Sequence, residues 1–255
     1  MGIGPIAKWK DAKLPDLWLR LRWALAVSVV TALLVPLIAG KWTPMKSFGL
    51  LLAFWIVATT VVNVLDRLRG VRSGVLAQLA RQPRSYWGMI LAHLGVAVFI
   101  VGVTLVKGYE TERDVKMAVG DTVTVGAHTF RFDGVAERNG PNYRATRGTF
   151  NVSRDGKHVE VMHPEKRIYN AGGMPMTEAA IDSSPIGDLY VSLGDPIGDG
   201  SWSVRVYSKP FVTWIWGGCL VMALGGFIAL TDRRYRTATR RATILPKGAR
   251  PAGAD

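Results

Sequence analysis

Residues 87–106 form an apolar stretch without a formal charge at neutral pH, and this stretch constrains the fold more than any other feature of the sequence. At about 1.5 Å per residue, a helix of this length spans roughly 30 Å, which matches the hydrocarbon core of a bilayer. Three further apolar runs of similar length lie at about residues 23–40, 47–65 and 211–230. We therefore predict four transmembrane helices.

Between the third and fourth apolar runs, residues 107–210 change to an alternation of apolar and polar side chains. A period of two is typical of strands with one buried face. Asp155-Gly156 lies between two of the alternating sets and predicts a tight hairpin turn. The apolar sets are Phe130 and Phe132, Phe150 and Val152, Val159 and Val161, Leu189 with Val191 and Leu193, and Trp202 with Val204 and Val206. The expected fold class is a polytopic α-helical membrane protein with an inserted, small antiparallel β domain, either a sandwich or a barrel.

The formal charge of +13 is concentrated in the segments that flank the apolar runs. Residues 1–22 carry five basic and two acidic side chains, residues 66–86 carry five basic and one acidic, and residues 231–255 carry seven basic and two acidic. By contrast, residues 107–210 carry thirteen basic and fourteen acidic side chains. Basic flanks mark the cytoplasmic side of membrane helices.

We therefore expect the basic N-terminal segment 1–22, the basic loop 66–86 and the basic tail 231–255 in the cytoplasm. The same pattern places transmembrane helices within 23–65, at 87–106 and at 211–230, and the β domain 107–210 on the opposite side of the membrane. The loop 66–86 is either a short helix on the membrane surface or a solvated connector. Because the basic residues lie in short loops and a tail, nucleic acid is not an expected partner.

His93 is the one titratable side chain within residues 87–106, and its burial in a membrane is costly unless a partner compensates for it. The neutral ring can hydrogen-bond to a polar group on a neighbouring helix, or it can bind a ligand such as haem iron. The helix alone leaves both roles open. No other histidine falls in an apolar run, so a haem with two histidine ligands would be shared with another polypeptide.

A stripe of small residues runs beside His93 along the same predicted helix. Gly88, Ala92, Gly95 and Gly102 recur at helical spacing, and small residues let membrane helices approach closely. The run 211–230 is also rich in small residues, which makes it the expected partner helix. These residues are Gly217, Gly218, Cys219, Ala223, Gly225 and Gly226.

The other residues that could act as ligands give no comparable indication of a binding site. We expect His128, His158 and His163 at the surface of the β domain rather than in a metal site. Met174 and Met176 have a side chain that can ligate haem, but packing is the usual role of methionine. The chain has one cysteine, which excludes an intramolecular disulfide and two-cysteine redox chemistry. No arrangement typical of a complete catalytic site is present, so no catalytic residue is assigned.

Several segments together resemble one known family. They are GIGP at residues 2–5, SYWGMILAHLGVAVFIVG at 85–102, MPMTEAAID at 174–182, DLYVSLG at 188–194 and WSVRVYSKPFVTWIW at 202–216. In this order, and across nearly all of the chain, they are similar to the C-terminal part of the CcmF family. Members of this family are the haem-lyase membrane subunits of the bacterial System I machinery for cytochrome c maturation.

The resemblance implies a multi-pass protein of the bacterial inner membrane, with the β domain in the periplasm and both termini in the cytoplasm. Family members take haem from a haem chaperone and attach it covalently to apocytochrome c. They also hold a separate haem b in the membrane. His93, in the sequence AHLG, matches one of the two membrane histidines that ligate this haem. The resemblance therefore assigns His93 as a haem-iron ligand in a shared site.

The family's tryptophan-rich WWD segment, the two histidines that flank it and the other membrane histidine have no match in this sequence. The resemblance thus implies a portion of a haem lyase that forms no thioether bonds alone. Its expected partners are an N-terminal CcmF-like half carrying the WWD segment, other System I proteins including the haem chaperone, apocytochrome c and membrane lipid.

The sequence leaves two alternative functions open. One is a membrane-anchored assembly scaffold that recruits periplasmic partners without binding haem. The other is half of a transporter, in which His93 would relay protons. The transporter hypothesis predicts internal repeats, and the apolar runs show none that is convincing.

Overall fold

The computed structural model of the chain describes residues 14–40, 42–70 and 74–232, so most of the predicted N-terminal segment and tail lie outside the described residues. The chain divides into two compact units, one within residues 1–101 and 216–255 and the other within residues 102–215. The first unit is helical and the second is largely a β-sandwich. Each unit is described by itself.

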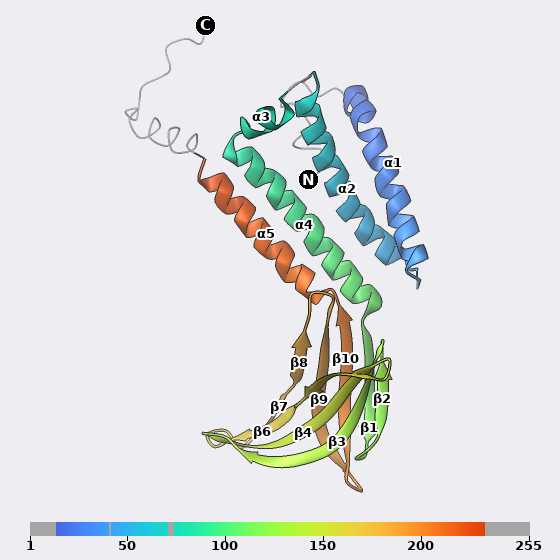
Figure 1. Ribbon diagram of the computed structural model, residues 1–255, viewed down its shortest axis with the longest axis vertical. Coiled ribbons are helices and arrows are strands. Elements are labelled where there is room, and N and C mark those ends of the chain that lie inside the picture. The colour runs from blue at the N-terminus through green and yellow to red at the C-terminus, as the bar shows by residue number, and fades with distance from the viewer. Residues whose placement is uncertain (1–13, 41, 71–73, 233–255) are drawn as a thin grey trace, which may run out of the picture. The chain divides into compact units, whose positions relative to one another are not determined.

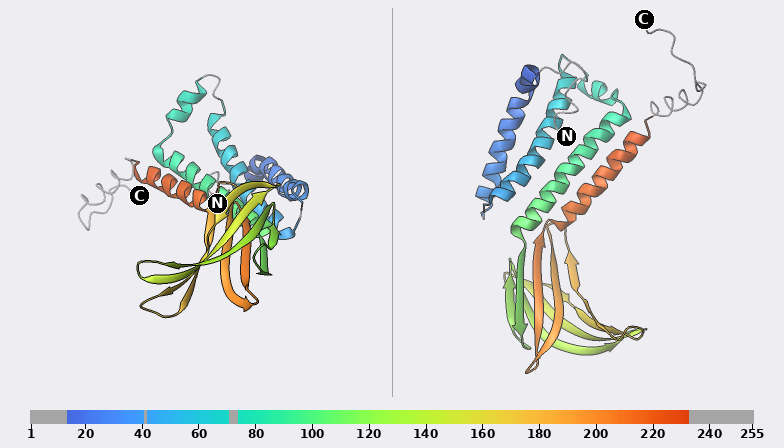
Figure 2. Two further views of the ribbon diagram at one scale, coloured as in Figure 1. Left: turned by 60° about the horizontal axis from the view of Figure 1, so that its bottom comes forward. Right: turned by 180° about the vertical axis from the view of Figure 1, so that it is seen from behind.

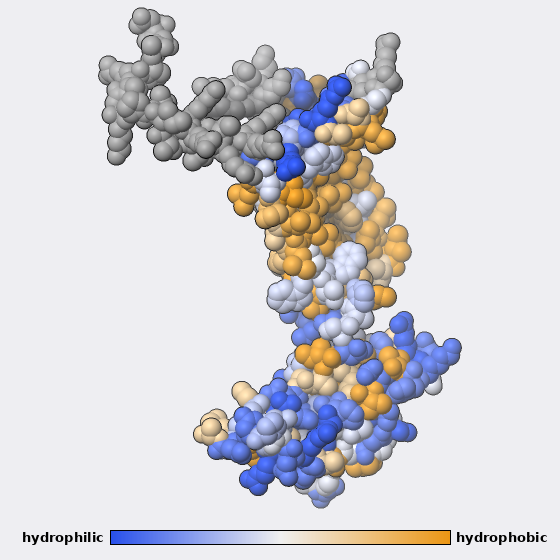
Figure 3. Space-filling view, turned by 60° about the vertical axis from the view of Figure 1, so that its left-hand side comes forward, coloured by the Kyte–Doolittle hydropathy of each residue, from blue (hydrophilic) through white to orange (hydrophobic). Residues whose placement is uncertain are grey.

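The helices, drawn in Figure 1, are α1 (Leu14–Ile38), α2 (Pro44–Leu68), α3 (Val75–Ala80), α4 (Arg84–Tyr109) and α5 (Val212–Leu230). Within the described residues, four of them are long and apolar enough to cross a membrane: α1, α2, α4 and α5. This confirms the predicted set of apolar helices. Their outer surface is broadly apolar, as the orange residues over the helices in Figure 3 show. Leu220 and Phe227 on α5 are examples, with 70% and 66% of their surface exposed.

Several helices are longer than the apolar runs that predicted them. The run at 23–40 belongs to a helix that already begins at Leu14, and α2 continues to Leu68. The added turns are polar, and Arg20 of α1 lies 3.5 Å from Asp66 of α2. Charged side chains at a helix end do not interrupt the backbone hydrogen bonds, so hydropathy alone underestimates the helix length. For the loop 66–86, the sequence allows either a short helix on the membrane surface or a solvated connector. The structure has a short helix there, α3.

Small residues bring α1 and α2 together. Ala24, Ser28 and Ala32 recur every four residues on α1 and are almost fully buried, as is Ala53 on α2. Ser28 donates its hydroxyl hydrogen to the carbonyl oxygen of Ala24, at 2.7 Å, so the polar group is satisfied within its own helix. Apolar lipid gives helices no hydrophobic drive to associate, and close backbone packing supplies the attraction instead.

The predicted glycine stripe of α4 packs against α5, and the two helices run side by side in Figures 1 and 2. A Cβ atom placed on Gly88 would lie 2.5 Å from the carbonyl oxygen of Gly225, and one on Gly95 would lie 2.6 Å from the backbone nitrogen of Met222. Only glycine permits this approach. By contrast, Gly217 and Gly226 of α5 have open space beside them, so they do not contribute to this contact.

The second unit contains a sandwich of two antiparallel sheets. One sheet has four strands in the order β1-β10-β9-β8, and the other has six, in the order β2-β3-β4-β6-β7 with β5 also paired to β4. The strands are β1 (Thr111–Met117), β2 (Thr122–Val125), β3 (His128–Asn139), β4 (Tyr143–Arg154), β5 (Lys157–Met162), β6 (Glu165–Tyr169), β7 (Pro175–Glu178), β8 (Ala180–Ser183), β9 (Gly187–Gly198) and β10 (Ser201–Pro210).

Most of the core of the sandwich consists of residues that the alternation singled out, and Met117, Val125 and Met162 are further core residues. Phe132 and Phe150 stack at 4.9 Å between ring centroids. The residues with no exposed surface are Val125, Phe130, Phe132, Phe150, Val152, Val191, Leu193, Val204 and Val206. The prediction of a β domain with one buried face to each strand is therefore confirmed, and the sandwich is the correct alternative.

Asp155-Gly156 is the predicted hairpin turn. Arg154 pairs with Lys157 across it, and both turn residues have positive φ, 50° for Asp155 and 75° for Gly156. This conformation fits the right-handed twist of the strands. Within β5, however, Val159 is 44% exposed and Met162 is the buried residue. A register shift between Val152 and Ser153 in the pairing of β4 with β5 changes which side chains face the core.

Candidate functional site

His93 lies in the first half of α4, half-buried within the helical unit. Its Nδ1 atom is 2.8 Å from the carbonyl oxygen of Met89, one turn earlier in the same helix. A carbonyl oxygen only accepts hydrogen bonds, so in this contact Nδ1 carries the hydrogen and donates it. In the neutral ring, Nε2 then has a free lone pair. This is the tautomer that binds a metal through Nε2, with the second nitrogen oriented by a backbone carbonyl.

The side of α4 that carries His93 differs from the side that contacts α5. Successive residues are about 100° apart round an α-helix, so His93 points away from the stripe that Ala92 and Gly95 form. Met89, His93 and Ala97 instead share one face, and Ala97 is 2% exposed. Within residues 14–40, 42–70 and 74–232, no hydrogen bond to Nε2 is present. The contact of His93 is thus with its own helix, and a bond to a neighbouring helix is not seen in that part of the chain.

The start of α4 is fixed by contacts with three other segments. The backbone N–H of Ser85 donates to Asp232 Oδ2 at 3.0 Å, just after the end of α5. The guanidinium carbon of Arg67 on α2 lies 4.2 Å above the ring of Tyr86. Trp87 Nε1 donates to the carbonyl oxygen of Leu79 on α3 at 3.3 Å. These contacts hold the first turn of α4, which precedes His93.

The arrangement fits one axial ligand of a haem. A neutral imidazole with a free Nε2 in an apolar helix is the donor that haem iron takes from histidine. The other histidines, at 128, 158 and 163, are outside the four candidate spans, so these spans supply a single histidine. Within the described residues, no group of three histidine, cysteine or carboxylate side chains is close enough to hold a metal ion.

The other candidates of the sequence analysis lie in the β-sandwich. His158 and His163 are exposed, as predicted. His128 is different, because its Nδ1 is buried and has no hydrogen-bond partner in the described part of the chain. Met174 and Met176 are 79% and 57% exposed, so neither packs in the core. Met174 precedes β7, and Met176 lies within β7, where it pairs with Arg167 of β6.

The β-sandwich has a cavity that no sequence pattern predicts. His128 of β3 and Arg154 of β4 face each other across the sheet and both line it. Their separation in the sequence has no characteristic spacing, because it is set by the length of the β3–β4 hairpin. The one signal that could have found them is the Asp155-Gly156 turn, which fixes where β4 ends.

The β-sandwich matches a family model described as "CcmF C-terminal beta-sandwich" over residues 108–210. The cytochrome c-type biogenesis protein CcmF of Pseudomonas aeruginosa is 45% identical over 240 residues, which cover 92% of this chain and 36% of that protein. The CcmF proteins of Escherichia coli and Haemophilus influenzae are 42% and 38% identical, again over 92% of this chain and 35% and 36% of their own length.

The solved structure of a protein titled "Cytochrome c Heme Lyase CcmF" has the same fold. Its TM-score is 0.70 at 23% identity, and the match covers 91% of this chain and 37% of that one. The chain therefore spans about a third of the length of the curated relatives and of the structure that it matches. The helices and the sandwich described above are together the part that is shared.

Proposed function

This chain corresponds to the C-terminal part of CcmF proteins, and on that premise we propose that it takes part in cytochrome c-type biogenesis. Its role is that of the C-terminal portion of a haem lyase, which attaches haem covalently to apocytochrome c. Within that role, the chain contributes His93 as one axial ligand of a b-type haem in the membrane. The relatives' names support the first statement, and the geometry of His93 supports the second.

The observation that carries the haem proposal is the hydrogen bond from His93 Nδ1 to the carbonyl oxygen of Met89. This bond selects the tautomer with a free Nε2 and holds the ring in one orientation. The small-residue contact of α4 with α5 uses another side of the helix, so that His93 does not take part in it. A bound haem would supply one-electron redox chemistry at its iron.

A second histidine ligand would have to come from outside the four candidate spans of this chain, since they hold no other histidine. We propose that it belongs to the N-terminal CcmF-like part that carries the WWD segment, whether on a longer form of the same chain or on a partner. The haem chaperone, other System I proteins and apocytochrome c are the further proposed partners, and membrane lipid surrounds the apolar helices.

For the location, we propose the bacterial inner membrane, with the β-sandwich in the periplasm and both termini in the cytoplasm. The charges support this orientation, because the basic flanks occur beside one end of each span and the β domain is nearly neutral. Covalent attachment of haem to apocytochrome c would then take place on the periplasmic side of the membrane, where the β-sandwich lies.

The test of the function is covalent haem attachment in cells. A strain that lacks this chain but makes its N-terminal CcmF-like part and a reporter apocytochrome is complemented with the wild-type chain, with His93→Ala or with His158→Ala. We expect the wild type and His158→Ala to restore haem bound covalently to the reporter, and His93→Ala to reduce it at least ten-fold. No restoration by the wild-type chain would contradict the proposed function. Full restoration by His93→Ala would favour a scaffold that does not bind haem.

A further inference from the structure

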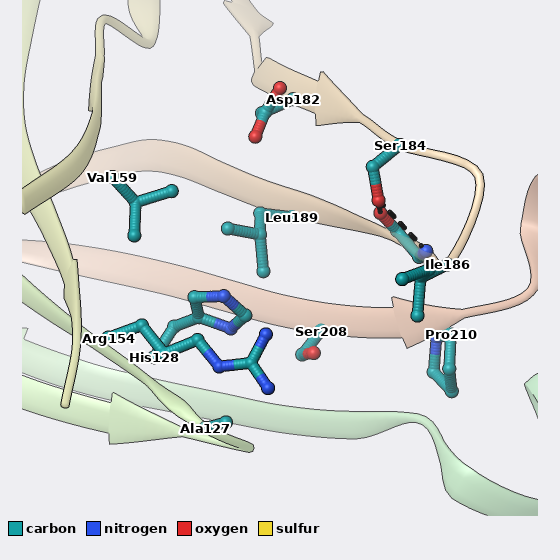
Figure 4. Close-up of a pocket in the computed structure, with 11 residues that line it drawn as sticks. Ala127, His128, Arg154, Val159, Asp182, Ser184, Ile186, Leu189, Ser208 and Pro210 are labelled. Carbon is teal, nitrogen blue, oxygen red and sulfur yellow. Dashed lines mark hydrogen bonds between the residues drawn. The ribbon is translucent and has the colours of Figure 1, made fainter.

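The β-sandwich contains a cavity of about 410 Å³, between β3, β4 and β5 on one side and β8, β9 and β10 on the other. Cavities of about 300–1,000 Å³ are typical of small-molecule sites in proteins. Much of the wall is apolar, and Figure 4 shows the side chains that surround the space. The main apolar contributors are Val159, Ile186, Leu189 and Pro210. Neither the relatives' names nor the role of His93 accounts for this cavity.

Two polar side chains of this wall lack partners. His128 and Arg154 are directly opposite each other in the pairing of β3 with β4. The Nδ1 atom of His128 is buried without a hydrogen bond, and the exposed side chain of Arg154 forms no ion pair, within residues 14–40, 42–70 and 74–232. A buried polar atom without a partner is destabilising, so His128 Nδ1 favours a polar group of a ligand, and the guanidinium of Arg154 is available beside it.

The charges around the cavity select a ligand with a single negative charge. Arg154 is always protonated and supplies one positive charge. Burial, and secondarily the charge of Arg154, lower the pKa of His128, although Asp182 and Asp155 act in the opposite direction. The imidazole is therefore neutral at pH 7 and adds a hydrogen-bonding atom rather than a charge. Asp182 is also part of the wall and would repel a doubly charged phosphate more strongly than a singly charged carboxylate.

We propose that this cavity binds the carboxylate end of an apolar molecule. Arg154 pairs with the carboxylate and His128 Nδ1 donates a hydrogen bond to it, while Val159, Ile186, Leu189 and Pro210 surround the apolar body. A planar guanidinium matches a carboxylate with two parallel hydrogen bonds. Two kinds of molecule share this chemistry: a fatty acid, and the C-terminal residue of a peptide that ends in an apolar side chain.

The test measures binding to the full chain in lipid nanodiscs by titration calorimetry, with empty nanodiscs as the reference. The probes are octanoate and the peptide acetyl-Ala-Leu with a free carboxyl end. Their neutral counterparts are 1-octanol and the same peptide with an amidated end. We expect at least one carboxylate to bind, and its neutral counterpart to bind at least ten-fold more weakly. Preferential binding of octanoate assigns a fatty acid, and preferential binding of the peptide assigns a polypeptide end.

Arg154→Gln is the variant that removes the proposed charge partner, and Arg138→Gln, at an exposed position of β3, is its matched control. We expect the affinity for the bound carboxylate to fall at least ten-fold in the first variant and to stay unchanged in the second. Val159→Trp fills the cavity from a strand position that is 44% exposed, so the sandwich tolerates it, and we expect it to abolish binding.

Three results would overturn the proposal. They are the absence of binding by both carboxylates to the wild type, equal binding by a carboxylate and its neutral counterpart, and unchanged affinity in both Arg154→Gln and Val159→Trp. None of these measurements involves haem or His93, so the proposal stands or falls independently of the haem-lyase role.

Discussion

Glu165 is a buried carboxylate of the β-sandwich, 6% exposed at the start of β6. Arg167 Nε donates to its Oε2 at 2.7 Å, and Arg147 Nε lies 3.1 Å from its Oε1 as an ion pair. The guanidinium of Arg167 also covers the ring of Tyr143, at 4.5 Å. The carboxylate therefore joins β6 to β4 through Arg147, whereas Arg167 is on the same strand as Glu165. In this region the backbone N–H of Gly148 donates to the carbonyl oxygen of Pro164.

We predict that Glu165→Gln destabilises the sandwich by about 1–3 kcal/mol, because it removes the charge partner of Arg147 and the nearer of two carboxylates beside Arg167, the other being Glu178 at 3.9 Å. The measurement is the midpoint of thermal unfolding of the full chain in detergent. Glu112→Gln is the control, since Glu112 pairs with Arg205 where both side chains are about half exposed. Exposed ion pairs contribute little. A loss in the control as large as in Glu165→Gln would contradict this explanation.

His128 gives the sandwich a dependence on pH. Burial and the charge of Arg154 lower its pKa below the ordinary value for histidine, about 6.5. The unfolded chain therefore binds the proton more readily than the folded one. Stability contributed by the neutral imidazole is fully present above about pH 6.5 and is lost as the pH falls through the lower folded-state pKa.

We predict that the unfolding midpoint of the wild-type sandwich falls between pH 6.5 and pH 5 more steeply than that of His128→Gln. His158→Gln, at an exposed position, serves as the control and should retain the wild-type slope. Equal slopes in the wild type and His128→Gln would show that burial of His128 does not contribute to this dependence.

At the scale of elements, the α4–α5 contact depends on the absence of side chains at particular positions. A Cβ atom on Gly95 would lie 2.6 Å from the backbone nitrogen of Met222 and 2.8 Å from the carbonyl oxygen of Gly218. Both are backbone atoms and cannot rotate away. Gly226 of α5 has nothing within 4 Å of the same built atom. The two positions therefore provide a matched pair of substitutions.

We predict that Gly95→Ala destabilises the helix pair by about 1–3 kcal/mol, as overpacking does, because α4 and α5 must separate to admit the methyl group. Gly226→Ala should leave stability unchanged or raise it slightly, since alanine favours a helix. Unfolding by SDS in mixed micelles measures the difference. If the two variants unfold at the same SDS fraction, close backbone packing does not hold these helices together.

The elements that the sequence predicted are those whose pattern is periodic. Uninterrupted apolar runs predict membrane helices, and period two predicts strands, because each follows directly from backbone geometry. The pairing register of the strands could not be predicted from the sequence in the same way. The shift at Phe132 and Gly134 in β3 and the shift at Val152 and Ser153 depend on how neighbouring strands pair, and the one local sign of either is Gly134, whose φ is 113°.

The same division applies to the candidate site. His93 could be singled out because a titratable side chain in an apolar run is unusual. Its hydrogen bond to Met89 depends on the rotamer of the ring, which the sequence does not specify. The pairing of His128 with Arg154 depends on strand register and could not be predicted either.

At the scale of the whole molecule, the proposed orientation rests on the distribution of basic residues. It predicts that the β3–β4 turn faces the periplasm and that α3 faces the cytoplasm. In a Cys219→Ser background, a membrane-impermeant maleimide applied to spheroplasts should label Asn139→Cys. Gln78→Cys on α3 should be labelled only after lysis. The reverse pattern of labelling would contradict the orientation.

Ligation of a haem by His93 can be tested by a reduced-minus-oxidised absorption spectrum of the detergent-purified chain, co-expressed with its proposed N-terminal half. Wild type, His93→Ala and His158→Ala are compared at equal protein level. We predict a b-type haem signal in the wild type and His158→Ala, and its loss in His93→Ala. A signal of the same size and position in His93→Ala would show that His93 does not ligate the haem.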